Sequence, residues 1–231
     1  MAAPMVSNNS ISKKTLRNIV IGNVTSAIIL ILITYIPFHG KSQLDIVSNP
    51  LGVTKFLSAS VMFLHGILHF LTQHQSNKGQ KFRLGILVKS ILKSALVFAA
   101  SLVFFHVIAI MFGAAFINET AETFHFAMML SSTTVGPLLI HLQSNVESWS
   151  RVFVFESPDL GMETTVFISS ITSVVGAWLG AFPIPLDWDK PWQAWPITCV
   201  LGALTGHCVG ILVASVHVCL QVYKQNKFKL T

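Results

Sequence analysis

The sequence predicts an all-α polytopic membrane protein, a single integral membrane domain over residues 1–231 built as a bundle of six transmembrane helices. Of its 231 residues, 52% are hydrophobic and only 10% are charged. A soluble domain carries about 25% charged residues. No alternation of apolar and polar residues predicts a membrane barrel. The formal net charge of +6 comes from short flanks of apolar segments, so it indicates membrane topology and no nucleic-acid partner.

Six apolar stretches reach the roughly 20 residues that a spanning helix needs. The first ends near Pro37, and the second follows Asn49-Pro50, since proline fixes φ and removes a donor. The third begins near residue 84, but Lys89 and Lys93 share a face of its first turns and are expected to reach the headgroups. The expected spans are therefore about 18–38, 51–71, 90–112, 123–142, 160–182 and 197–223.

The segment between the fourth and fifth spans, residues 143–159, mixes apolar side chains with Ser, Asn, Glu and Arg. This composition is typical of a short amphipathic helix on the membrane surface. A solvated linker explains it equally well, so both interpretations remain open.

The Lys and Arg residues divide unequally between the two sides of the predicted membrane. Twelve fall on the side that holds both termini, and the other three are Lys41, Lys55 and Lys190. Cytosolic loops carry an excess of Lys and Arg. We therefore expect both termini in the cytosol and the connections at 113–122 and 183–196 in the lumen.

Two lysines near the end of the chain match a retrieval signal. Lys227 and Lys229 are the fifth and third residues from the C-terminus, as in the dilysine signal that returns membrane proteins to the endoplasmic reticulum. A cytosolic C-terminus is where such a signal is read. The alternative is an ordinary basic flank of the last span.

The most distinctive stretch is the predicted lumenal connection at 183–196, which holds four of the nine prolines and three of the five tryptophans. Proline prevents the helix from continuing, and tryptophan favours the boundary between hydrocarbon and water. We expect a stiff loop on the membrane surface, with its aspartates bonded to loop backbone or to Lys190. The candidate structural or partner-binding residues are Pro183, Pro185, Asp187, Trp188, Asp189, Pro191, Trp192, Trp195 and Pro196.

Small residues recur at four-residue spacing in the last two spans. That spacing lets helix backbones approach closely. The contact can lie within this chain or against another membrane protein, and both interpretations remain open. The predicted packing residues are Gly176, Gly180, Gly202, Gly206 and Gly210.

Catalytic groups are sparse in the predicted spans. No Asp or Glu lies deep in any of them, and no cofactor or metal site is predicted. Histidine is the one catalytic candidate found there, with His65 and His69 four residues apart on one helix face. We interpret these histidines as interhelical hydrogen-bonding groups, which contribute about 0.6 kcal/mol each in membranes.

The residues of the 183–196 connection resemble the phosphatidylinositol-glycan class F (PIG-F) family of glycosylphosphatidylinositol (GPI) anchor assembly. The resemblance rests on the run Pro183-Ile184-Pro185-Leu186-Asp187-Trp188-Asp189, with Pro191-Trp192-Gln193 and Trp195-Pro196 after it. Phe112-Gly113-Ala114 with Glu122-Thr123 matches an earlier family pattern, although Ala115 stands where that pattern has proline.

This resemblance implies a non-catalytic subunit in the endoplasmic reticulum membrane. Members of the family are similar in associating with and stabilising the large transferases PIG-O and PIG-G. Those partners move ethanolamine phosphate from phosphatidylethanolamine to mannoses of the GPI glycan. The expected partners are therefore PIG-O-like and PIG-G-like transferases, together with membrane lipids such as a GPI precursor or phosphatidylethanolamine.

Two other functions remain open from the sequence. One is a transporter or scramblase for GPI intermediates or phosphatidylethanolamine, suggested by polar patches in the spans. The other is a transferase that acts at the lumenal surface in its own right, using His125 with Glu119, Glu122, Asp187 and Asp189, with or without a divalent metal.

Overall fold

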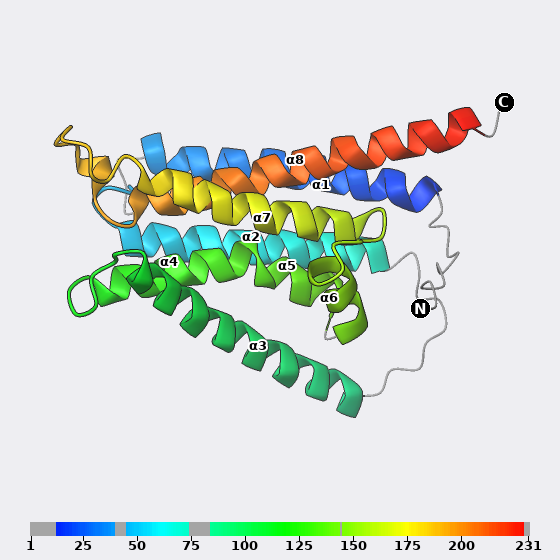
Figure 1. Ribbon diagram of the computed structural model, residues 1–231, viewed down its shortest axis with the longest axis horizontal. Helices are drawn as coiled ribbons and strands as arrows, with labels where there is room; N and C mark the ends of the chain where they lie inside the picture. The colour runs from blue at the N-terminus through cyan, green and yellow to red at the C-terminus, as the bar shows by residue number, and fades with distance from the viewer. Residues whose placement is uncertain (1–12, 40–44, 74–83, 144, 229–231) are drawn as a thin grey trace.

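The computed structural model describes residues 13–39, 45–73, 84–143 and 145–228, and these contain helices and no strand (Figure 1). The elements are α1 (Lys13–His39), α2 (Pro50–Gln73), α3 (Leu84–Met111), α4 (Thr120–Thr133), α5 (Val135–His141), α6 (Val146–Phe153), α7 (Met162–Ala181), the 3₁₀ turn η1 (Pro191–Gln193) and α8 (Ile197–Phe228).

Six helical stretches are long and apolar enough to cross a membrane, which confirms the predicted fold class. Helices α1, α2, α3, α7 and α8 each supply one stretch, and α4 and α5 together supply the sixth, Thr120–His141. Some helices run past the expected spans, since α1 begins at Lys13 and α8 continues to Phe228. An apolar run marks the part inside hydrocarbon, whereas the helix continues into the interfacial layer.

The fourth span is broken between α4 and α5, which the sequence analysis did not foresee. Thr134 leaves regular helical geometry, with φ −111° and ψ −68°. Pro137 follows three residues later and lacks the N–H that would bond the carbonyl of Thr133. The signal for the break was therefore present in the sequence.

Residues 143–159 include a helix, α6, which decides between the two open interpretations in favour of helix. Its first turn is capped by Asn145, whose side chain accepts a hydrogen bond from Glu147 N at 3.0 Å. Arg151 then joins α6 to α7, because its Nε donates to Glu163 Oε2 at 3.0 Å. That hydrogen bond is the main cause of a raised pKa of the Arg151 guanidinium. The ion pair fixes α6 against the start of α7.

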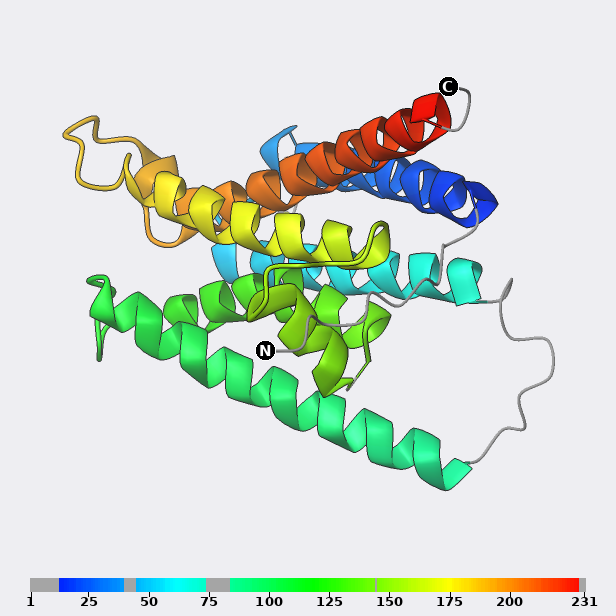
Figure 2. The same ribbon diagram turned by 45° about the vertical axis from the view of Figure 1, so that its right-hand side comes forward.

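The helices lie side by side and most follow a common direction (Figure 1). The α3–α4 and α7–α8 connections lie at one end of the bundle, called here the loop end. Helix α6 lies toward the other end, the α6 end, where α1 begins and α8 finishes. Helix α3 leans away from the other helices toward the α6 end in both views, so most of its large apolar side chains stay exposed (Figure 2).

The tightest helix pair is α7 with α8, whose backbones touch through glycines. A Cβ added to Gly176 would meet the carbonyl oxygen of Gly202 and lie 3.0 Å from Gly206 Cα. A Cβ on Gly180 would lie 2.9 Å from Cys199 Cα, and one on Gly210 would lie 3.0 Å from Ser169 N. The predicted packing glycines thus all face the partner helix of this pair within the chain.

Buried polar side chains join α2 to α5 and to α8, and they also strengthen the α7–α8 pair itself. His65 on α2 lies 3.1 Å from His141 of α5 through Nδ1, and 2.9 Å from His207 of α8 through Nε2. The hydroxyl of Ser173 on α7 donates to the Ala203 carbonyl of α8 at 3.0 Å. The interpretation of the histidines as interhelical hydrogen-bonding groups is confirmed for these three.

Alanine at Gly176 or Gly202 should destabilise the fold, because the added methyl group meets backbone that cannot move independently. We expect a loss of about 1–3 kcal/mol in the free energy of unfolding. Thermal unfolding in detergent micelles measures the effect. Gly66→Ala is the matched control: a Cβ there meets nothing within 4 Å, so it should leave the midpoint unchanged or raise it. Equal midpoints for all three variants would contradict the tight contact.

Replacing His65 with phenylalanine should remove two interhelical hydrogen bonds and leave two buried imidazole nitrogens without partners. We expect a loss of about 1–2 kcal/mol, the sum of two such bonds in a membrane. His69→Phe is the control, since within the described part of the chain the His69 side chain has no hydrogen bond and meets His141 ring to ring, with centroids 5.6 Å apart. A loss for His69→Phe as large as that for His65→Phe would show that the hydrogen bonds contribute little.

Candidate functional site

The α7–α8 loop, residues 182–196, forms the most distinctive surface at the loop end. Helix α7 ends at Ala181, since Pro183 and Pro185 prevent it from continuing. All nine residues predicted for this site lie on the loop, between Pro183 and Pro196. The structure therefore offers one continuous segment, held at both ends by the packed pair α7 and α8.

One buried side chain, Gln193, holds the loop together. Its Nε2 donates to the carbonyl oxygens of Pro183 at 2.8 Å and Leu186 at 2.7 Å. Its Oε1 accepts from Lys190 N at 2.8 Å. Only 9% of Gln193 is exposed. An amide supplies two donors and an acceptor on one group, which these three backbone atoms require.

The base of the loop is fixed to α4 by Trp195. Its indole Nε1 donates to Thr123 Oγ1 at 3.1 Å, and its ring meets Phe126 edge to face with centroids 5.1 Å apart. Thr123 and Phe126 are both buried. The loop is thus attached to a third helix as well as to α7 and α8.

The tip of the loop, defined here as Asp187, Trp188 and Asp189, points away from this support. Trp188 is 53% exposed and touches Trp192 edge to face, with centroids 5.8 Å apart. Asp189 has φ +50°, in the left-handed region that aspartate tolerates better than most residues. Both carboxylates are exposed.

The expectation that these aspartates bond to loop backbone or to Lys190 is wrong. Within the described residues, neither carboxylate has a hydrogen bond or an ion pair. The reason is chemical, because the inner loop atoms at Pro183 and Leu186 are carbonyl oxygens, which need donors. An ionised carboxylate only accepts. Gln193 therefore holds the shape, and the tip carries two unpaired negative charges beside an exposed indole.

The residues of the alternative lumenal transferase site are not joined to one another in the described structure. The Nδ1 of His125 lies 2.6 Å from the Ala121 carbonyl of its own helix. No hydrogen bond or ion pair among the described residues joins His125, Glu119 or Glu122 to the tip aspartates. In the same part of the chain, no group of three or more His, Cys, Asp or Glu side chains could hold a metal ion.

One lysine of the predicted retrieval signal, Lys227, lies far from the loop. Lys227 is in the last turn of α8, at the α6 end, and Lys229 lies outside the described residues.

Two supporting residues were missed by the sequence analysis as parts of the site. Gln193 was noted only within the Pro191-Trp192-Gln193 run, and Thr123 only within an earlier motif. A lone uncharged amide within an aromatic, proline-rich loop was the available signal for Gln193. No sequence signal pairs Thr123 with Trp195, which are 72 residues apart.

Comparisons with known proteins agree with one another. The family model described as "GPI biosynthesis protein family Pig-F" matches residues 9–215. The "GPI ethanolamine phosphate transferase, stabilizing subunit" of Homo sapiens is 36% identical over 185 residues, covering 80% of this chain and 84% of that protein. The Mus musculus protein of the same name is 35% identical over 192 residues, covering 83% and 87%. No solved structure matches the chain.

A fungal relative is similar over a shorter stretch. "Glycosylphosphatidylinositol anchor biosynthesis protein 11" of Yarrowia lipolytica is 42% identical over 125 residues, covering 52% of this chain and 53% of that protein.

Replacing Gln193 with glutamate should loosen the loop more than any change at its tip. The carboxylate keeps the size of the amide but turns acceptor oxygens toward the Pro183 and Leu186 carbonyls. We expect a loss of about 1–3 kcal/mol, and faster amide hydrogen exchange across residues 183–194. Trp188→Ala is the control and should change stability by about 0.5 kcal/mol or less, as exposed positions do. Unchanged exchange in Gln193→Glu would show that the prolines alone keep the loop ordered.

Proposed function

The chain belongs to the PIG-F family of GPI biosynthesis proteins, and from that membership we propose that it is a non-catalytic membrane subunit of ethanolamine phosphate transferases. In this proposal it binds and stabilises the enzymes that add ethanolamine phosphate to mannose of GPI-anchor precursors. The main support is the likeness, over most of both chains, to two proteins named as stabilising subunits of a GPI ethanolamine phosphate transferase.

The geometry of the loop supports a binding role. Its backbone is already ordered by Gln193, Trp195 and the prolines, so little conformational entropy is lost when a partner binds. An exposed tryptophan is typical of the residues that dominate binding energies. The unpaired carboxylates of Asp187 and Asp189 favour Lys or Arg on the partner. We propose that the tip contacts the transferase directly.

We further propose that the protein spans the endoplasmic reticulum membrane with both termini in the cytosol and the α7–α8 loop in the lumen. The excess of Lys and Arg on the side of the termini supports this orientation. The separation of the connections between the loop end and the α6 end is compatible with it (Figure 1). PIG-O-like and PIG-G-like transferases are the proposed partners, with Lys227 and Lys229 as the proposed retrieval signal.

Loop-tip variants should lose the transferase while keeping the fold. In cells depleted of the native protein, Trp188→Ala and the double change Asp187→Asn with Asp189→Asn should lower co-purified transferase about 30-fold, as loss of a dominant interface residue does. Transferase abundance should fall with it, and GPI precursors lacking ethanolamine phosphate should accumulate. Immunoblots and mass spectrometry of the precursors measure both. Trp178→Ala, an equally large change at an exposed position of α7, is the matched control.

Asp187→Asn also separates binding from chemistry. Normal assembly with the transferase together with loss of transfer would mean that the carboxylate takes part in the reaction, and would overturn the accessory role. Normal transferase levels and normal precursors after complete depletion would overturn it as well.

A further inference from the structure

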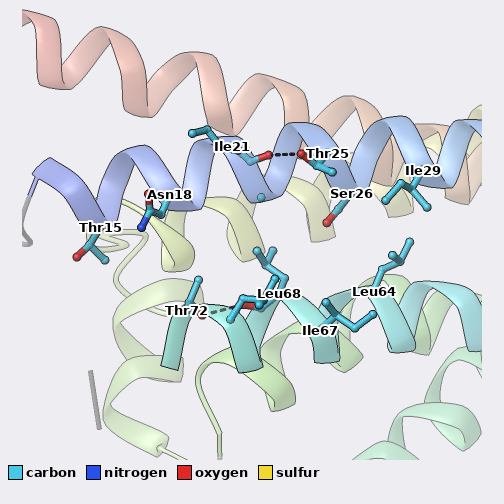
Figure 3. Close-up of a pocket in the computed structure, with 12 residues that line it drawn as sticks. Thr15, Asn18, Ile21, Thr25, Ser26, Ile29, Leu64, Ile67, Leu68 and Thr72 are labelled. Carbon is cyan, nitrogen blue, oxygen red and sulfur yellow. Dashed lines mark hydrogen bonds between the residues drawn. The ribbon is translucent and has the colours of Figure 1, made fainter. Parts of the chain in front are cut away.

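A groove of about 620 Å³ lies between α1 and α2, within the size range of small-molecule sites (Figure 3). Apolar side chains of both helices form its walls, among them Ile21, Ile29, Leu64 and Ile67. Among the described residues that line it, none is acidic. The groove is therefore a mainly apolar hollow between two helices that are long and apolar enough to cross a membrane.

Small side chains on α1 create the hollow. Gly22, Thr25 and Ser26 line it over little more than one turn. The Thr25 hydroxyl donates to the Ile21 carbonyl at 2.8 Å, so it is satisfied within its own helix. Ser26 is only 8% exposed, and its hydroxyl has no hydrogen-bond partner within the described residues. In Figure 3 this hydroxyl points across the groove toward α2.

The groove has the length of one membrane leaflet. Its lining runs from Thr15 to Ile29 on α1, about 21 Å at 1.5 Å per residue, and from Leu64 to Thr72 on α2, about 12 Å. Half of the hydrocarbon core measures about 15 Å. Beyond its deep end, Leu30 of α1 lies in the same buried core cluster as Leu57 and Val61 of α2. A membrane-spanning helix needs a groove through both leaflets, whereas an acyl chain needs only one.

The groove also changes from polar to apolar along its length. Thr15 and Asn18 line it near the start of α1, and Thr72 lines it near the end of α2, both at the α6 end. Lys14 and Arg17 are exposed and lie one helical turn before the lining residues Asn18 and Ile21. Two cations therefore stand at the mouth, where the phosphate of a lipid would lie.

We propose that this groove binds a phospholipid, with one acyl chain between α1 and α2 and the phosphate beside Lys14 and Arg17. The site serves the leaflet at the α6 end, which the proposed orientation makes the cytosolic leaflet. Lipid binding requires no transferase. The lipid site can therefore be tested on the purified chain, independently of the proposed accessory role.

Native mass spectrometry of the purified full-length chain tests the site. The chain is incubated with dioleoyl phosphatidylglycerol or with dioleoylglycerol, which has the same chains and no phosphate. We expect retention of the phospholipid and about tenfold less retention of dioleoylglycerol.

Ser26→Leu fills the groove and removes an unpaired hydroxyl, so it should cut phospholipid retention about tenfold without lowering thermal stability. Ala100→Leu, the same size of addition on the exposed face of α3, should change nothing.

The role of Lys14 and Arg17 in holding the phosphate is tested with separate variants. Changing both Lys14 and Arg17 to glutamine should weaken phospholipid binding about fivefold per cation, while Lys89→Gln on α3 should not. Equal retention in Ser26→Leu and Ala100→Leu, or of dioleoylglycerol and the phospholipid, would overturn the proposal. A photo-crosslink from position 67 to a transferase helix would place a protein in the groove and would overturn it as well.

Discussion

Backbone contact between α7 and α8 is the constraint on which the rest of the molecule depends. In hydrocarbon, helices gain nothing by hiding apolar surface from one another, so close packing must hold them together. Gly176 and Gly202 allow the two backbones to touch, and the Ser173 hydroxyl reaches the Ala203 carbonyl across the same contact. The pair in turn sets the positions of Phe182 and Pro196, between which the loop must close.

Hydrogen bonds between buried polar side chains join further helices to one another and to this pair. His65 joins α2 to α5 and α8, and Asn23 of α1 donates to Thr165 of α7 at 2.9 Å. At the loop end, the side chain of Gln193 donates to the Pro183 carbonyl and the indole of Trp195 donates to Thr123. The carboxylates of Asp187 and Asp189 have no such partner among the described residues. A rigid support that exposes an indole and two unpaired charges is well suited to recognition.

Much of this could be predicted from the sequence, because hydropathy and proline act locally. The six spans follow from apolar length, and the position of the loop follows from Pro183, Pro185 and Trp188. The role of Gln193 could not be predicted, because its partners are backbone carbonyls that converge only after the loop has folded. The tip aspartates were misassigned for the same reason. The α1–α2 groove depends on which side chains of two helices face each other in the folded bundle, and no local pattern encodes that.

In the proposed complex, the loop tip touches a transferase. A photo-crosslinking amino acid at position 188, in chains expressed in cells and irradiated in their native membranes, tests it most directly. We expect a crosslinked product that contains an ethanolamine phosphate transferase, and no such product from the same probe at Val103 on the exposed face of α3. Efficient crosslinking of the transferase from position 103, with none from position 188, would contradict it.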